Sequence, residues 1–341
     1  MAVQQSHAAP ESAEMLGQLQ ALVDRVWPGG VVEGLRRLTG GASQDTWSFD
    51  VRQGDRRDPM ILRHSGSKGQ AEPDAVPLPE EARLIRKVAQ YDLPVPEVLY
   101  VLSPDDGLGD GFIMRRIRGE TFPPRILGSA ELASARQKLA HQCGRFLGRM
   151  HRIPAEELDF LRVSGAEEEL ERYYAVYRSY GIRRPVFELA FRWLRDRMPG
   201  ADSRVALVHG DFRHGNLMVA EDGLQAVIDW ELAHLGNPME DLGWICVASW
   251  RFGQLDLPVG GFGTREALFA GYEEAGGGVV DPDLVSWWEV YGTLRWGVIC
   301  QMMAHSYKSG ANRTVERAVV GRRSSEAEID LLHLLAPLNR G

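Results

Sequence analysis

The stretch that decides the fold of this chain is Val208-His209-Gly210-Asp211-Phe212-Arg213-His214-Gly215-Asn216-Leu217-Met218-Val219, followed by Val227-Ile228-Asp229-Trp230-Glu231. Its apolar runs predict short strands, and Asp211, Asn216 and Asp229 lie between or directly after them. Asn216 follows Asp211 by five positions and Asp229 follows it by eighteen. This layout can hold one catalytic carboxylate and two oxygen ligands for Mg²⁺ around the phosphates of a nucleotide.

The three residue types fit the demands of phosphoryl transfer. The reaction needs positioning and charge neutralisation, with a carboxylate that orients the incoming hydroxyl and accepts its proton. Asp211 suits this role, and the oxygens of Asn216 and Asp229 are hard ligands of the kind that Mg²⁺ prefers. Asp and Asn are also frequent in ordinary turns, so none of them would be informative alone. Together, with strands around them, they predict a catalytic site.

Other chemistries fit the stretch less well. His209, Asp211, His214 and His234 raise the alternative of a metal hydrolase, but their spacing matches no common zinc signature such as HExxH. Asn216 would also remain unexplained. The chain contains neither GxxxxGKS/T nor GxGxxG, so neither a P-loop nor a dinucleotide-binding fingerprint is present.

Length and composition set the broad class. A chain of 341 residues, 44% hydrophobic and 25% charged, can form two lobes that each have a core. The net charge of −8 argues against a general nucleic-acid binder. No apolar stretch is long enough to span a bilayer, the N-terminus shows no secretion signal, and Cys143, Cys246 and Cys300 form no CxxC pair. We therefore expect a cytoplasmic protein without membrane or nucleic-acid partners.

The N-terminal third predicts a β-rich region. Residues 1–12 are polar and Ala-rich, which predicts disorder, and apolar spacing predicts a helix over 14–27. The elements predicted next are a hairpin over 35–51, a strand over 60–63, a helix over 80–89 and a strand pair over 98–102 and 111–117. These elements would form a five-stranded antiparallel sheet with one helix.

Two features of this region could serve a ligand or could be structural. The hairpin tip, Gly40-Gly41-Ala42-Ser43, is either a simple turn or a loop whose backbone N–H groups cover phosphates. Arg63 ends a strand, and Glu81 lies in the first turns of the next helix, where it could reach Arg63. Both could equally be solvated surface charges.

Gly119 and the Pro123-Pro124 pair mark a change to a mainly helical region, so we expect an N-terminal lobe over 1–117 and a C-terminal lobe over 118–341. Helices are predicted over 130–151, 167–180 and 185–198, and from Met239, Arg265, Leu284 and Ser325 onward. Short strands are predicted over 206–208, 217–219 and 225–228.

The segment His209–Asn216, with Ile228-Asp229-Trp230 and Gly236-Asn237-Pro238-Met239-Glu240-Asp241-Leu242, resembles the aminoglycoside phosphotransferase and choline kinase family. It is similar in particular to kinase-like regions joined to acyl-CoA dehydrogenases. The resemblance extends from about Leu35 to at least Tyr272. It implies an α+β, protein-kinase-like fold, with a small lobe built on an antiparallel sheet, a larger helical lobe, and ATP between them.

The resemblance also implies roles for individual residues. Asp211 would be the catalytic base, Asn216 and Asp229 would bind Mg²⁺, and His209 and Asp241 would brace the catalytic loop. The residues expected to contact the nucleotide are Gly40, Gly41, Ser43, Arg63, Glu81 and the hinge residues Met114, Arg115 and Arg116.

One position departs from the family pattern. The family usually has a lysine where this chain has Arg63, and the only lysines here are Lys68, Lys87, Lys138 and Lys308. Arginine keeps the charge and adds a planar fork. Because the base and both metal ligands are present, we expect an active ATP- and Mg²⁺-dependent phosphotransferase, with a nucleotide-binding pseudokinase as the alternative. A protein kinase is disfavoured, because HRD, DFG and an APE-type activation segment are missing.

The catalytic motif does not identify the acceptor, which we expect to be a small molecule with a hydroxyl group. The C-terminal part contains Trp287, Trp288, Trp296, Met302 and Met303, followed by Lys308, Arg313, Arg317, Arg322 and Arg323. These could be core aromatics and a solvated basic face. If they line the cleft, Trp296, Arg317, Arg322 and Arg323 favour an apolar acceptor with an anionic group, such as a hydroxy acid or hydroxyacyl-CoA. An antibiotic phosphotransferase, acting on an aminoglycoside or a macrolide, is the alternative.

Overall fold

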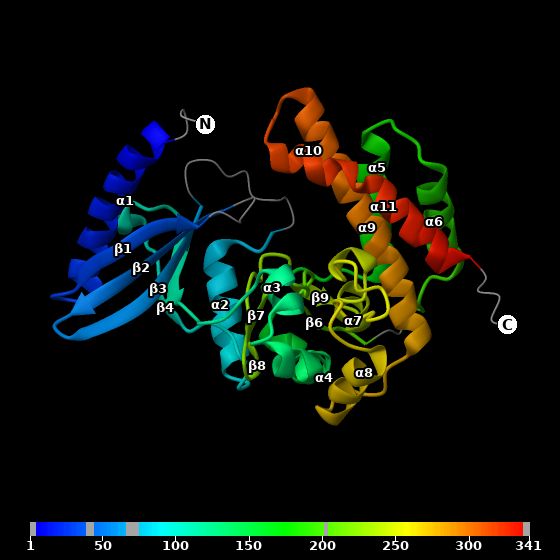
Figure 1. The fold of residues 1–341 in the computed structure, drawn as a ribbon, viewed down its shortest axis with the longest axis horizontal. Helices are drawn as coiled ribbons and strands as arrows, with labels where there is room; N and C mark the ends of the chain where they lie inside the picture. The colour runs from blue at the N-terminus through cyan, green and yellow to red at the C-terminus, as the bar shows by residue number, and fades with distance from the viewer. Residues whose placement is uncertain (1–4, 39–43, 66–74, 201–203, 337–341) are drawn as a thin grey trace. The chain divides into compact units, whose positions relative to one another are not determined.

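The computed structural model describes residues 5–38, 44–65, 75–200 and 204–336, and the chain divides into two compact units (Figure 1). The first unit contains residues 1–118 together with a returning segment, 226–232. The second contains residues 119–225 and 233–341. The returning segment carries Asp229, so this residue belongs to the same unit as Arg63 although the two are far apart in sequence.

A five-stranded antiparallel sheet forms the centre of the first unit, in the order β1-β2-β3-β5-β4. The strands are β1 (Val31–Leu38), β2 (Asp45–Gln53), β3 (Arg56–His64), β4 (Val98–Val101) and β5 (Gly111–Arg115). The β2–β3 hairpin turns at Gly54, whose φ of 59° suits a tight turn. The predicted antiparallel sheet and fold class are confirmed.

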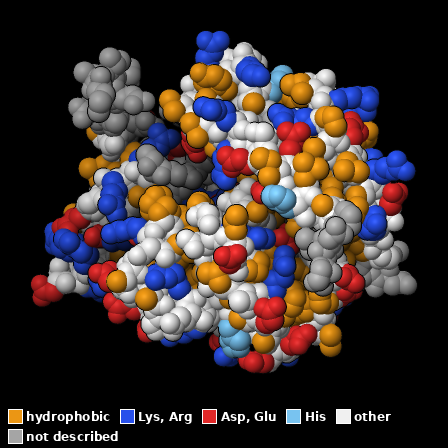
Figure 2. Space-filling view, turned by 45° about the vertical axis from the view of Figure 1, so that its right-hand side comes forward, with side chains coloured by type: hydrophobic (Ala, Val, Ile, Leu, Met, Phe, Trp, Pro, Cys, Tyr) orange, Lys and Arg blue, Asp and Glu red, His pale blue; other side chains and the backbone are white. Residues whose placement is uncertain are grey.

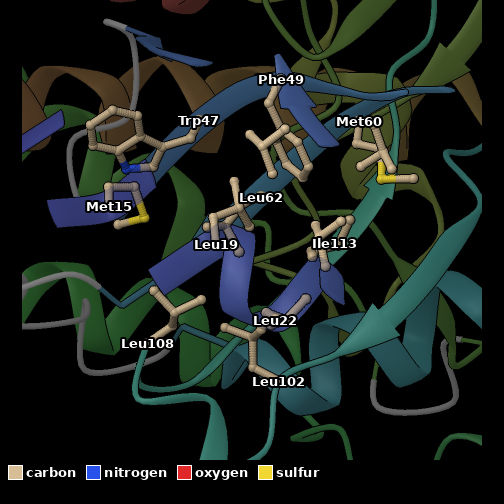
Figure 3. Close-up of a cluster of buried hydrophobic side chains, with 13 residues drawn as sticks. Met15, Leu19, Leu22, Trp47, Phe49, Met60, Leu62, Leu102, Leu108 and Ile113 are labelled. Atoms are coloured by element: carbon tan, nitrogen blue, oxygen red, sulfur yellow. The ribbon is translucent and has the colours of Figure 1, made fainter. Parts of the chain in front are cut away.

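Helix α1 (Gln5–Val26) covers the sheet, and α2 (Leu78–Ala89) follows β3. Leu19 and Leu22 of α1 pack with Phe49, Leu62 and Ile113 of the sheet in one buried cluster (Figure 3). The helix begins earlier than expected, because the segment from Gln5 to Ser12, for which the sequence predicts disorder, already belongs to it. Its alanines favour helix formation. Residues 1–4 lie outside the described part of the chain.

The second unit is mainly helical. Its helices are α3 (Pro123–Gly128), α4 (Ala133–Met150), α5 (Ala166–Ser179), α6 (Pro185–Asp196), α7 (Met239–Trp244), α8 (Arg265–Glu274), α9 (Pro282–Ser309), α10 (Val315–Arg322) and α11 (Ser324–Leu335). Strand β6 (Ala206–Val208) pairs with β9 (His234–Gly236), and β7 (Leu217–Ala220) pairs with β8 (Gly223–Val227). The short elements α3, α10 and β9 were not predicted, since few residues give too weak a periodic pattern.

Helices α4 and α8 approach very closely. A Cβ atom added at Gly144 would collide with the carbonyl oxygen of Leu268, and one added at Gly271 would collide with that of His141. The glycines therefore permit a backbone approach that side chains would prevent. This packing brings Tyr272 of α8 to His151, at the end of α4.

Charged side chains of both signs are interspersed with hydrophobic ones on the face of the molecule shown in Figure 2. In the described part of the chain, none of the helices is both long enough and apolar enough to cross a membrane.

Candidate active site

The loop between β6 and β7 carries Asp211 and Asn216. Gly210, with φ of 79°, and Gly215, with φ of 94°, lie in the left-handed region and let the chain turn before and after Asp211. Apolar residues of β6 and β7 are buried on either side, including Val208 and Leu217 at 0% exposure. The sequence thus places a polar loop between two fixed strand ends.

Asp241, in the first turn of α7, holds the start of this loop. Its Oδ2 accepts the backbone N–H of His209 at 2.8 Å, and its Oδ1 accepts that of Gly210 at 3.0 Å. Burial favours the neutral acid, but hydrogen bonds from His151 and His209 outweigh it and lower the pKa of Asp241. The side chain is therefore a buried carboxylate that fixes two backbone groups.

A chain of hydrogen bonds continues behind Asp241. Nε2 of His151 lies 3.3 Å from its carboxylate, and Nδ1 of His151 lies 3.0 Å from the hydroxyl of Tyr272. Burial lowers the pKa of His151, which favours the neutral ring. A neutral ring that donates from Nε2 accepts the Tyr272 proton at Nδ1.

Asp211 and Asn216 lie in direct contact. Nδ2 of Asn216 donates to Asp211 Oδ2 at 2.7 Å and to the Asp211 carbonyl oxygen at 2.9 Å. Since both neighbours are acceptors, the amide nitrogen must face them and the amide oxygen must face away. That oxygen is of the kind that binds Mg²⁺.

Two further donors reach Asp211. Arg213 Nε donates to its Oδ1 at 2.8 Å, and Trp244 Nε1 donates to the same oxygen at 3.0 Å. The guanidinium of Arg213 also lies 4.7 Å from the centre of the Trp250 ring. Neither donor was predicted from the sequence. Arg213 was visible inside the loop motif, whereas nothing in the sequence indicates that Trp244 reaches Asp211.

The histidines near this loop do not form a metal site. Nδ1 of His209 accepts the backbone N–H of Asp211 at 3.2 Å, Nε2 of His214 lies 2.6 Å from the Gly260 carbonyl oxygen, and Nε2 of His234 lies 3.3 Å from Glu240. No three His, Cys, Asp or Glu side chains within the described ranges gather in a way that could hold a metal ion. The arrangement does not support the zinc-hydrolase alternative.

Arg63 and its partners form a second cluster, within the first unit. Its guanidinium lies 2.6 Å from Asp229, 3.1 Å from Glu231 and 3.4 Å from Glu81. The side chains of Arg63 and Glu81 are 12% and 1% exposed, so neither is a solvated surface charge. Oε1 of Glu81 also accepts the backbone N–H of Trp230 at 3.1 Å. The role of Glu231 was missed, because only the fold shows which way its side chain points.

The balance of charge in this cluster is negative, with three carboxylates around one guanidinium. Burial raises the pKa of Glu81 to about 7, although Arg63 acts in the opposite direction. The surrounding carboxylates, Glu81 first among them, raise the pKa of Arg63 despite its burial. Asp229 itself has φ of 67°, in the left-handed region that Asp tolerates better than most residues.

Arg63→Met should destabilise the first unit by about 3 kcal/mol near neutral pH, because the buried Glu81 and the partly exposed Asp229 and Glu231 lose their counter-charge. The loss should depend on pH. Without Arg63 the pKa of Glu81 rises further above its unfolded value, so the variant keeps stability at low pH and loses it as the pH rises through the folded-state pKa. Thermal unfolding at about pH 5.5 and about pH 8 measures this difference.

Arg56→Met, on the same strand but with a 68% exposed side chain, is the control for Arg63→Met. Equal losses at the two pH values would contradict the prediction.

The expected hinge residues are engaged with the sheet. Arg115 donates from Nε to Glu97 at 2.8 Å, and Arg116 donates from Nη2 to Asp50 at 2.6 Å. Their backbone N–H groups donate to the carbonyl oxygens of Glu97 and Pro59. Met114 pairs within the sheet between β3 and β4. The backbone N–H groups of Arg115 and Arg116 are therefore already hydrogen-bonded, and the expected contact of the three residues with adenine stays a prediction. Gly40, Gly41 and Ser43 lie outside the described residues.

The C-terminal aromatic residues divide into two groups. Trp287 and Trp288 are 3% and 1% exposed, and Trp287 Nε1 donates to the Leu194 carbonyl oxygen at 3.1 Å. They are core residues, which is one of the two alternatives that the sequence left open. Trp296 is half-buried, and its ring centre lies 4.9 Å from that of Trp250.

The three arginines expected near an acceptor are placed differently from one another. Arg323 lies 5.6 Å from the centre of the Trp296 ring and 2.9 Å from Glu326. Arg317 Nη1 lies 2.8 Å from the sulfur of Met303, and Arg322 is exposed at the end of α10. The structure thus brings Arg323 and Trp296 together.

Comparison with solved structures identifies the fold class. A protein from Ralstonia eutropha JMP134, provisionally described as an aminoglycoside phosphotransferase, superposes with a TM-score of 0.72 at 22% identity, over 93% of this chain and 97% of that one. A macrolide 2′-phosphotransferase type I gives a TM-score of 0.60 at 18% identity, over 94% and 97% of the two chains. The chain therefore has the protein-kinase-like fold of small-molecule phosphotransferases, as predicted.

The sequence comparison identifies the family. Residues 34–277 match the profile of the phosphotransferase enzyme family, and the chain belongs to this family. Acyl-CoA dehydrogenase family member 10 of Mus musculus is 29% identical over 60% of this chain, and the probable acyl-CoA dehydrogenase IBR3 of Arabidopsis thaliana is 29% identical over 61%. The matches span only 20% and 27% of the lengths of these relatives. The resemblance noted from the sequence is confirmed.

Proposed function

We propose that this protein transfers the γ-phosphoryl group of ATP to a hydroxyl group of a small molecule, with Asp211 as the base. The observation that supports this most directly is the geometry of the loop. Asp241 fixes the backbone before Asp211, and Asn216 fixes the Asp211 carboxylate from the other side. A carboxylate held in this way has the fixed direction that proton transfer requires.

In the proposed reaction, the acceptor hydroxyl gives its proton to Asp211 as its oxygen forms a bond to the γ-phosphorus. The bond from that phosphorus to the oxygen bridging it to the β-phosphate breaks. The products are a phosphate monoester, ADP and the proton on Asp211. Asn216 and Asp229 would supply oxygen ligands to Mg²⁺, whose charge neutralises the phosphates.

Arg63 would bind phosphate oxygens with its planar fork, in the place where the family usually has lysine. The carboxylate of Glu81 would hold Arg63 in position, as their 3.4 Å separation suggests. Nucleotide use agrees with the neighbours, since APH(2″)-IIIa was solved with GDP and kanamycin and a spectinomycin phosphotransferase with ADP and spectinomycin. We propose that backbone groups after Arg116 contact the adenine of ATP.

The free, buried cysteines Cys143, Cys246 and Cys300 support the proposal of a reducing cytoplasm.

For the acceptor we propose a hydroxy acid or a hydroxyacyl-CoA. The sequence relatives are acyl-CoA dehydrogenase family members, which supports an acyl-type acceptor. The pairing of Trp296 with Arg323 offers an apolar face beside a cation. The second candidate is an antibiotic acceptor, for which the support is the likeness of fold to aminoglycoside and macrolide phosphotransferases.

A screen of ATP consumption would test the proposal. Purified protein with Mg²⁺ and ATP is assayed against hydroxyacyl-CoAs, hydroxy acids, amino sugars, macrolides and choline, with EDTA as the control. We expect ADP and a phosphate monoester with a member of the first two classes. Turnover of an amino sugar or macrolide alone would favour the antibiotic alternative. Nucleotide binding without transfer to any acceptor would identify a pseudokinase.

Replacing Arg317, Arg322 and Arg323 by alanine should raise the KM for an anionic acceptor about tenfold, because charge-assisted contacts of about 1.4 kcal/mol are lost. The KM for ATP should not change. Steady-state kinetics with the acceptor found in the screen measures both values. Arg192→Ala on α6, with an 82% exposed side chain, is the control. An unaltered acceptor KM would remove these arginines from the acceptor site.

A further inference from the structure

The carboxylate of Asp211 has an uneven set of hydrogen bonds. A carboxylate offers about four lone-pair positions, two on each oxygen. Arg213 and Trp244 both donate to Oδ1, and Asn216 donates to Oδ2. Among the described residues, this leaves one lone pair of Oδ2 as the position that can accept a proton from a substrate. The direction in which this lone pair points depends on the donors to Oδ1.

Trp244 is the more rigid of these two donors. It ends α7 and is 4% exposed, with its ring centre 5.2 Å from that of Trp250. An indole has a single donor, so the N–H that binds Asp211 can bind nothing else. Arg213, by contrast, keeps a side chain that is 30% exposed.

A buried arginine faces the Trp244 ring. The guanidinium of Arg295, from the middle of α9, lies 4.6 Å from the centre of that ring, a cation–π distance. Arg295 is itself 4% exposed. Its Nε donates to the Tyr173 hydroxyl at 3.1 Å, and its Nη1 lies 3.6 Å from Glu240. These partners fix the guanidinium in one place.

Arg295 also reaches the catalytic loop directly. Its Nη1 donates to the carbonyl oxygen of Gly210 at 3.1 Å, one residue before Asp211. The N–H of Gly210 is held by Asp241 from α7. The peptide groups on the two sides of Gly210 are therefore fixed from two helices, and the side chain of Asp211 is fixed through Trp244.

We propose that Trp244 and Arg295 are positioning residues for the transfer reaction: together they aim the Asp211 carboxylate so that the remaining lone pair of Oδ2 receives the proton of the acceptor. This inference rests on the proposed function of Asp211. Neither residue touches the reacting atoms. Their contribution is the direction of the base, and it should appear in kcat and not in the binding of ATP.

Trp244→Phe tests the inference, since it keeps a ring beneath Arg295 and removes only the donor to Asp211. We expect kcat for the acceptor found in the screen to fall about tenfold, which corresponds to about 1.4 kcal/mol, the size of one hydrogen bond to a charged group. The KM for ATP and the nucleotide Kd should stay at wild-type values. Arg295→Met should lower kcat by a similar factor, and Arg295→Lys, which keeps a cation near the indole, should restore part of it.

A matched control separates positioning from stability. Trp287→Phe removes another buried indole hydrogen bond in the same unit, the one to Leu194, far along the chain from the loop. It should lower the melting temperature about as much as Trp244→Phe does and leave kcat unchanged. Equal losses of kcat in the two variants, or wild-type kcat in Trp244→Phe, would overturn the inference. If Asp211→Asn retains full activity, the proposed function itself fails. If Trp244→Phe is fully active while Asp211→Asn is not, the proposed function stands and the positioning role of Trp244 and Arg295 fails.

Discussion

Asp211→Asn should lower kcat by a factor of roughly 10²–10⁴, the usual contribution of a general base. Asparagine has nearly the same shape, and its amide oxygen can still accept from Arg213 and Trp244, while Asp241 continues to hold the loop backbone, so the loop should keep its fold. The change removes the group that accepts the proton of the acceptor hydroxyl. ATP should bind as in the wild type, because the cluster around Arg63 is untouched. Single-turnover measurement of phosphate transfer, together with nucleotide titration, would give the two quantities separately.

The control for this variant is Asp222→Asn. Asp222 is an exposed aspartate in the turn between β7 and β8, in the same unit. The exchange alters the net charge by the same amount, so a change in kcat here would reflect charge alone. We expect none. If Asp211→Asn transfers phosphate at the wild-type rate, Asp211 is not the base.

Asp241→Ala should destabilise the second unit by roughly 4–6 kcal/mol. The backbone N–H groups of His209 and Gly210 lose their acceptor, and so does Nε2 of His151. Each buried donor left without a partner costs about 1–3 kcal/mol. The full effect should exceed that of an ordinary core substitution, because the carboxylate is 0% exposed and water cannot replace it without rearrangement. Urea unfolding followed by tryptophan fluorescence measures the loss.

Asp256→Ala is the control for stability, since Asp256 is exposed in the same unit. It should change the unfolding free energy by less than about 0.5 kcal/mol. Asp241→Asn makes the test sharper. An amide can accept from one of the two backbone groups but turns its own N–H₂ toward the other, so it should rescue little. Wild-type stability in Asp241→Ala would show that the loop holds its shape without the brace.

The aromatic residues of α9 show where the sequence pattern left two interpretations open. Trp287 and Trp288, followed downstream by arginines, were compatible with core residues or with a binding surface, and both are buried. The reason lies in the pattern of the whole helix. Buried residues from Val285 to Gln301 occur on every side of α9, as expected of a helix enclosed by others. A helix of this kind indicates a core, and the signal was present in the sequence.

Sequence alone determined the elements that depend on local order. The strands on either side of Asp211 and Asn216, the antiparallel sheet and the order of the longer helices follow from apolar periodicity. Five positions separate Asp211 and Asn216, and the two glycines in that loop let the chain fold back so that they touch. The proximity of Arg63 and Glu81 could also be expected from the sequence, because a single loop connects strand β3, which carries Arg63, to helix α2, which carries Glu81.

The tertiary structure decided which distant residues complete these clusters. Glu231 joins Arg63 only because residues 226–232 return to the first unit. Trp244 and Arg295 reach Asp211 and Gly210 from two different helices, and no spacing in the sequence encodes such contacts. The loop motif alone points to Asp211 as the proposed base and to Asn216 as the proposed ligand beside it, since the two lie within a few residues. The contacts that Asp211 and Gly210 receive from α7 and α9 depend on packing between helices, and therefore on side chains far apart in the chain.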